Sequence, residues 1–75
     1  MVRIQDICRD GVRLLFKQRF EPGTLLRLEV PRKPQETPLL VQARVVHVVP
    51  YRDGSFGLGC AFSRPLTDEE LKDLM

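Results

Sequence analysis

The stretch "DICRDG", residues 6–11, decides how the first part of this 75-residue chain folds. It joins "VRIQDI" at residues 2–7 to "GVRLLFK" at residues 11–17 and overlaps the end of the first and the start of the second. In both of these segments apolar and polar side chains alternate. Such alternation indicates half-buried strands. An Asp-Gly pair between two strands is a strong hairpin signal, because both residues tolerate the positive φ of tight hairpin turns. The sequence therefore predicts an antiparallel hairpin that turns at Asp10 and Gly11.

The same alternation predicts which side chains share a face of each strand. Successive side chains of a strand point to opposite sides. In the first strand this places Ile4 and Asp6 on one face and Ile7 on the other. In the second strand, Val12 and Leu14 share a face.

Turn signals divide the middle of the chain into three more strand-like segments. These are "LLRLEV" at 25–30, the β-branched "LLVQARVVHVV" at 39–49, and "SFGLGCAF" at 55–62. Pro22-Gly23 and Asp53-Gly54 mark turns, and the proline-rich "PRKPQETP" at 31–38 is predicted to be the longest loop.

Two of these segments depart from a plain strand pattern. Paired valines at 45–46 and 48–49 interrupt the alternation, so a bulge or bend is expected there. In the last segment, bulky side chains alternate with Gly57, Gly59 and Ala61. One face of that strand is nearly bare, which lets another backbone or a ligand approach closely.

The end of the chain changes to a helical pattern. In "RPLTDEELKDLM", residues 64–75, Thr67 is followed three residues later by Glu70, which is a capping box. Acidic residues fill the first turn, where the helix dipole favours negative charge. The expected fold is therefore mainly β, a small antiparallel barrel or sandwich of about five strands with one C-terminal α-helix.

Composition favours a single domain over residues 1–75. Apolar residues make up 43% of the chain, charged residues 29%, and the net charge of +2 is too small to imply nucleic acid by itself. No apolar run approaches the length of roughly 20 residues that crosses a bilayer, and the first residues lack the apolar segment of a signal peptide. A cytoplasmic location without a membrane span is expected.

Residues suited to catalysis or metal binding are scarce. His47 is the only histidine and lies in a valine-rich strand, where an ordinary strand side chain is expected. Cys8 and Cys60 lie far apart and form no CxxC pair, so they predict neither a metal site nor a cytosolic disulfide. We therefore expect no catalytic residue, no metal, no cofactor and no enzymatic activity.

Asp6, Cys8 and Gly11 follow the pattern D-x-C-x-x-G between the first two predicted strands. Here the chain resembles the PilZ domain family, whose members bind the bacterial second messenger cyclic di-GMP and whose second signature is D/N-x-S-x-x-G. Cysteine takes the place of serine. Further stretches are similar to the family's later strands and closing helix, so the resemblance covers nearly the whole chain. They are "FEPGTLLRLEV" at 20–30, "VQARVVHV" at 41–48 and "GSFGLGCAFSRPLTDEELKDLM" at 54–75.

The resemblance implies a cyclic di-GMP site on the barrel surface, to which this motif contributes. Asp6 and Gly11 keep the family's residues, whereas Cys8 is a weaker hydrogen-bond donor than serine. With Arg9, inside the motif, and Arg3, they make up the expected ligand-binding residues.

The family's first signature, R-x-x-x-R, precedes the second by a longer segment and supplies most of the grip on phosphates and guanine. Only five residues precede Asp6, and Arg3 is the one arginine among them. The strand that follows this signature in the family is missing as well. Arg9 and Arg13 are expected near the same face, but they do not replace the signature. We therefore expect a PilZ-like barrel without its first strand, in which cyclic di-GMP binding is absent or weakened.

Three functions remain open from the sequence. The first is a PilZ-like signalling or adaptor domain that acts through protein partners or self-association. The second is a working cyclic di-GMP receptor, completed by arginines from another chain or segment. The third is a small structural or nucleic-acid-binding β-barrel whose motif is an ordinary hairpin, although nucleic acid is not the favoured partner.

A homo-oligomer is predicted from the missing strand. Removing one strand from a closed barrel leaves two unpaired edges, and exposed edges invite pairing with another chain.

Overall fold

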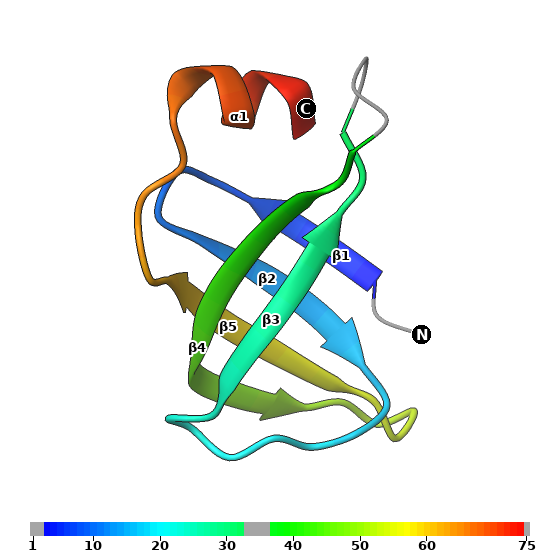
Figure 1. Ribbon diagram of the computed structural model, residues 1–75. Helices are drawn as coiled ribbons and strands as arrows, with labels where there is room; N and C mark the ends of the chain where they lie inside the picture. Colours follow the sequence, from blue (N-terminus) through cyan, green and yellow to red (C-terminus); the bar gives the residue numbers. More distant parts are fainter. Residues whose placement is uncertain (1–2, 33–36, 75) are drawn as a thin grey trace.

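Within the residues that the structure describes, the protein folds as five strands followed by one short helix (Figure 1). The computed structural model describes residues 3–32 and 37–74. The strands are β1 (Arg3–Ile7), β2 (Gly11–Phe16), β3 (Leu25–Val30), β4 (Leu39–Pro50) and β5 (Phe56–Phe62), and the helix is α1 (Asp68–Leu74). Residues 33–36 of the predicted proline-rich loop, and Val2 of the predicted first strand, lie outside the described residues.

The strands form one antiparallel sheet in the order β1-β2-β5-β4-β3. The sheet curls into a half-barrel, and α1 lies at one end of it (Figure 1). Within the described residues, β1 and β3 are the two edges and have no partner strand on their outer sides. The predicted fold, a small mainly β domain of about five antiparallel strands with a C-terminal helix, is confirmed.

The inner face of the half-barrel holds the core. The alternating apolar residues of β2, β4 and β5 form its buried cluster, which consists of Val12, Leu14, Ala43, Val45, Leu58 and Cys60. Leu14, Val45 and Leu58 are each only 1% exposed. Full burial of a side chain of this size contributes about 1.5–3 kcal/mol. The three central strands therefore carry most of the hydrophobic stabilisation.

The bulge that the paired valines predicted is present in β4. The register between β4 and β5 shifts between Val45 and His47. Val45 faces the core, whereas Val46 and His47 are both exposed. The extra residue therefore turns His47 onto the outer face of the sheet.

A second bulge, in β1, was not predicted. The register between β1 and β2 shifts between Ile4 and Asp6. Ile4 and Ile7 consequently line the same groove at the inner face, while Asp6 lines a groove on the outer face. The prediction that Ile4 and Asp6 share a face is wrong, because one extra residue reverses the side to which the following side chains point.

Two of the predicted turns are built on glycines with positive φ. Gly23 has a φ of 95° and Gly54 a φ of 89°. At the second turn, the Ser55 amide and hydroxyl donate to the Asp53 carboxylate at 3.0 and 2.6 Å. These two hydrogen bonds lower the pKa of Asp53. The turn between β4 and β5 is thus fixed by its own side chains.

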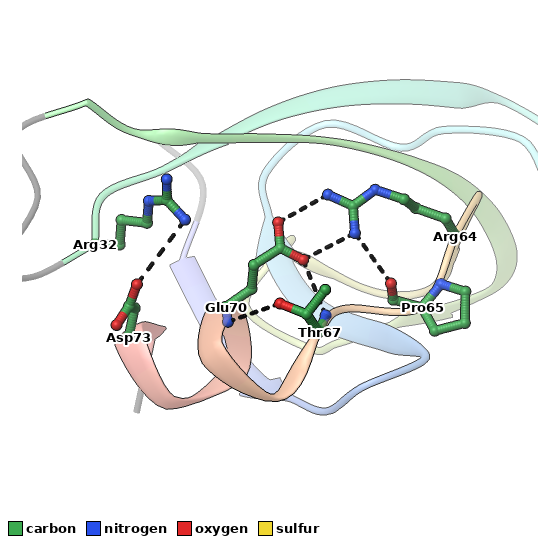
Figure 2. Close-up of polar contacts among 6 residues, drawn as sticks. All are labelled: Arg32, Arg64, Pro65, Thr67, Glu70 and Asp73. Carbon is green, nitrogen blue, oxygen red and sulfur yellow. Dashed lines mark hydrogen bonds and ion pairs between the residues drawn. The ribbon is translucent and has the colours of Figure 1, made fainter.

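The predicted capping box forms at the start of α1 (Figure 2). The Glu70 amide donates to the Thr67 hydroxyl at 3.1 Å, and the Thr67 amide donates to the Glu70 carboxylate at 2.9 Å. Arg64 adds two hydrogen bonds to the same carboxylate, both of 2.8 Å. The Arg64 guanidinium, helped by the Thr67 amide, lowers the pKa of Glu70 from 4.5 to about 2.

Helix α1 is attached to the sheet through its preceding segment and by two ion pairs. Leu66 is only 2% exposed, and its amide donates to the Arg9 carbonyl at 2.8 Å. Arg9 forms an ion pair with Asp68, and Arg32 lies 3.9 Å from the Asp73 carboxylate (Figure 2 shows the second pair). The helix is therefore held at both ends.

We predict that the capping box makes stability depend on pH at the acidic end. Because the folded state lowers the pKa of Glu70, its contribution is complete above about pH 4.5 and is lost as the pH falls toward 2. Glu70→Gln should reduce that part of the pH dependence in urea titrations. Thr67→Ala should lower the free energy of unfolding by about 1 kcal/mol at neutral pH. An acid dependence unchanged by Glu70→Gln would contradict this assignment.

Candidate functional site

A groove on the outer face of the sheet brings the motif together with residues of β4 and β5. We call it the outer groove. It is lined by Asp6, Cys8, Asp10, Gly11, Val12, Arg13, Val46, His47, Gly59, Cys60 and Ala61. The three signature positions of the motif, Asp6, Cys8 and Gly11, all lie on it. The structure therefore gathers residues that are more than forty positions apart in the sequence into one surface.

Four residues cross the floor of the outer groove in a single row. Asp6 pairs with Arg13, Arg13 with Gly59, and Gly59 with His47. The two bulges put the outer members of this row, Asp6 and His47, on the outer face. Directly opposed residues of neighbouring strands have Cβ atoms about 4.5–5.5 Å apart. The row is therefore one continuous strip across four strands.

The bare face of β5 forms the bottom of the groove, but side chains of β4 and of the residue that follows it lie over parts of this face. A Cβ added to Gly59 would overlap the His47 ring, and one added to Gly57 would lie 2.9 Å from the Tyr51 hydroxyl. Both rings therefore rest directly on the glycines. The prediction for this face was an approach by another backbone or a ligand, whereas within the described residues the side chains of His47 and Tyr51 make the close approach.

The outer groove carries charged side chains of both signs. Asp6 and Asp10 supply two carboxylates, Arg13 supplies one guanidinium, and His47 adds an imidazole. The groove therefore offers hydrogen-bond acceptors as well as a cation. Such a set suits a ligand that carries both donor groups and negative charge.

Arg9 and Arg3 are not brought to this groove. The Arg9 guanidinium pairs with Asp68 at the start of α1, and its carbonyl accepts from the Leu66 amide. Arg3 is exposed in β1, where it pairs with Leu15. Neither lines the outer groove. Of the five predicted site residues, Asp6, Cys8 and Gly11 lie together and the two arginines lie elsewhere.

The motif turn itself is held by backbone contacts. The Cys8 amide donates to the Gly11 carbonyl at 2.9 Å, and the Asp10 carbonyl accepts from the Phe62 amide at 2.9 Å. Gly11 does not use the positive φ that glycine tolerates. It is the first residue of β2, and a Cβ there would overlap the Cys60 carbonyl oxygen. Glycine is required by the neighbouring strand rather than by the turn.

The sequence did not predict His47 and Gly59 as site residues, and it predicted for Arg13 only a general place near the motif. The register of the paired strands places these residues beside the motif. The bulges that set this register are only weakly indicated by the sequence. The available signal was the G-x-G-x-A alternation of β5. A strand with no side chains on one face leaves a depression wherever its neighbours carry larger residues.

Residues 3–32 and 37–74 hold no cluster of three or more His, Cys, Asp or Glu side chains placed to bind a metal ion. Cys8 is an exposed free thiol and Cys60 a buried one. Burial raises the pKa of the Cys60 thiol. In the described part of the chain, no helix combines the length and the apolar character that crossing a membrane demands.

A sequence model of the PilZ domain family matches residues 1–75, the whole of the chain. Comparisons with curated proteins and with solved structures returned no match.

We predict that Gly11 and Gly59 differ sharply in their tolerance of alanine. Gly11→Ala forces the new methyl against the backbone of β5, so it should lower the free energy of unfolding by about 1–3 kcal/mol. Gly59→Ala meets only the exposed His47 ring, which can rotate away, so its effect should stay within about 0.5 kcal/mol. Urea denaturation measures both. Equal losses, or a larger loss at Gly59, would contradict the assigned close approach.

The two thiols should also react at very different rates. Native protein should react with a thiol reagent such as DTNB at one fast equivalent, because Cys8 is exposed while burial keeps Cys60 protonated and shielded. Cys8→Ser should abolish the fast phase, and unfolding in urea should release the second equivalent. Two fast equivalents in the native protein would contradict the burial of Cys60.

Proposed function

Because this chain belongs to the PilZ domain family, we propose that its outer groove is a weak cyclic di-GMP site and that its output runs through other proteins or through self-association. The family makes it a signalling or adaptor domain of the cyclic di-GMP-binding type, and the family is one of binding domains rather than catalysts. The observation that carries the proposal is the row from Asp6 through Arg13 and Gly59 to His47.

Each motif residue has a chemical part in this proposal. The Asp6 carboxylate is an acceptor suited to the N–H donors on the edge of a guanine. Gly11 keeps the motif turn packed against β5, because its missing Cβ leaves room for the Cys60 carbonyl. Arg13 offers a planar fork for a phosphate or for the guanine acceptors. Cys8 is a weaker donor than the serine of the family signature.

Charge supports weak binding. A cyclic dinucleotide carries two phosphates, and tight recognition of such groups uses several charge-assisted hydrogen bonds. The outer groove sets two carboxylates, Asp6 and Asp10, against a single guanidinium, that of Arg13. Arg9, the other arginine of the motif region, is paired with Asp68. The groove therefore attracts a dianion less than a site with several unpaired arginines does.

Output through protein contacts is supported by the open sheet. Both edge strands present backbone groups on sides where no strand of the described residues pairs with them. Such edges are ready surfaces for another chain. We place this activity in the cytoplasm, where cyclic di-GMP is available to bacterial proteins.

Ligand titration tests the proposal. Cyclic di-GMP at about 100 μM should raise the melting temperature by no more than about 3 °C, because a ligand near its Kd stabilises by only about 0.4 kcal/mol. Calorimetry at higher concentration should still detect binding. Arg13→Ala and Asp6→Ala should abolish that residual binding, and Cys8→Ser should strengthen it. Lys17→Ala and Glu69→Ala serve as charge controls outside the outer groove and should leave it unchanged.

A large response would favour the alternative, a working receptor completed by arginines from another chain or segment. Saturation at 100 times Kd stabilises by about 2.7 kcal/mol, which raises the melting temperature of a domain of this size by about 10 °C or more. Residual binding that survives both Arg13→Ala and Asp6→Ala would contradict the assignment of the outer groove.

A further inference from the structure

We infer that β3 is the self-association edge, and that two copies of the chain pair through β3 in an antiparallel arrangement with Leu28 at the two-fold axis. This deepens the self-association proposed above and rests on it. β3 differs from the other edge, β1, in the regularity of its pairing, in the direction of its free backbone groups and in the order of its charges.

The two edges of the sheet differ in their fitness for pairing. β3 is six residues long and pairs with β4 without any register shift. β1 is five residues long and is interrupted by the bulge between Ile4 and Asp6. Bulges on edge strands protect against pairing with other chains. The regular edge, β3, is therefore the one open to a partner.

The backbone of β3 presents a complete set of groups to the open side. Antiparallel pairs alternate between residues that exchange hydrogen bonds and residues that do not. The Val45 amide donates to the Thr24 carbonyl at 2.9 Å, just before β3 begins. Thr24 therefore directs its backbone groups toward β4, and so does every second residue after it, namely Leu26, Leu28 and Val30. The other β3 residues, Leu25, Arg27 and Glu29, direct theirs outward.

The opposite side of β4 gives the same assignment. There the Ser63 amide donates to the Gln42 carbonyl at 2.8 Å, so even-numbered residues of β4 face β5 and odd-numbered ones face β3.

The charges of β3 are self-complementary in one register. When Leu28 of one copy lies opposite Leu28 of the other, Arg27 of each copy lies opposite Glu29 of its partner. Both residues are exposed, and neither forms an ion pair with the residues that the structure describes. This register also makes Arg27 and Glu29 the hydrogen-bonded pair, which is the pair whose backbone groups face outward. Opposite charges placed directly across two strands stabilise the pairing.

The two nearest registers that also pair the outward-facing backbone groups are disfavoured. A shift of two residues in one direction places Arg27 opposite Arg27, and a shift in the other direction places Glu29 opposite Glu29. Like charges directly opposed destabilise a strand pair. The charge order therefore selects one register.

The apolar side chains of β3 gain a partner in the same register. Leu26 lies opposite Val30, and Leu28 opposite itself. Leu26 and Leu28 are only half-buried, and Leu28 and Val30 border the open groove between β3 and the first two strands. Pairing of two copies brings these side chains into contact and removes apolar surface from water.

A charge exchange tests the register. Sedimentation equilibrium of the wild-type chain should show a concentration-dependent dimer. Arg27→Glu should raise the dimer dissociation constant by about tenfold or more, because it replaces two attractive pairs with two repulsive ones. Glu29→Arg should do the same, and the double variant Arg27→Glu/Glu29→Arg should restore wild-type affinity. Arg3→Glu, on the other edge, is the matched control and should have no effect.

Cross-linking tests the axis. In a Cys8→Ser background, Leu28→Cys should form an intermolecular disulfide on mild oxidation, because non-hydrogen-bonded residues at the axis have Cα atoms about 4.5 Å apart. Leu26→Cys should not, since its opposite residue is Val30. Circular dichroism confirms that each variant is folded.

The outcomes separate the two proposals. A dimer that is weakened by Arg3→Glu and not by Arg27→Glu would overturn the assignment to β3 and leave self-association standing. A dimer that Arg27→Glu weakens and that the double variant Arg27→Glu/Glu29→Arg does not restore would also overturn the assignment to β3. A strict monomer at high concentration would overturn both the β3 assignment and self-association, while leaving the outer groove as a nucleotide site.

Discussion

The close approach of β2 to β5 at Gly11 is the contact on which the rest of the structure depends. Because no side chain separates Gly11 from the Cys60 carbonyl, the motif turn lies directly against the end of β5. There the Asp10 carbonyl accepts from the amide of Phe62, the last residue of β5, and the Arg9 carbonyl accepts from the amide of Leu66, in the segment that leads to α1. The same six residues that carry the family signature therefore also position the helix.

The bulges in β1 and β4 make the motif turn part of the outer groove. The bulge in β1 turns Asp6 to the outer face, and the bulge in β4 does the same for His47. Between them β5 contributes almost no side chains, so Arg13 and the two outer residues surround a shallow floor. Local irregularity in two strands thus creates the outer groove, while the regular alternation of the central strands builds the core beneath it.

Much of the fold follows from the sequence because its signals are local. The capping box of α1, the turns at Gly23 and Gly54 and the bulge in β4 are all confirmed by the structure. The bulge at Gln5 was not foreseen, since nothing in the alternation of β1 marks it. The reason for glycine at position 11 could not be read from the sequence either, because Gly11 has no positive φ and what requires glycine there is the Cys60 carbonyl of β5, a strand far away in the sequence.

Only the part of the candidate site that lies close together in the sequence could be predicted. Asp6, Cys8 and Gly11 lie within six residues of the sequence, whereas Gly59 and His47 join them only through the register of β5 and β4. Arg9 was expected to bind ligand, but its guanidinium is paired with Asp68, a contact that no local pattern announces.

The most direct test of this account is an NMR titration of ¹⁵N-labelled protein with cyclic di-GMP up to millimolar concentration. We expect progressive, fast-exchange shifts of the amides of Asp6, Arg13, His47 and Gly59, with little change along β3. Shifts centred on any other face of the sheet, or no shift in the outer groove at the highest concentration, would contradict it.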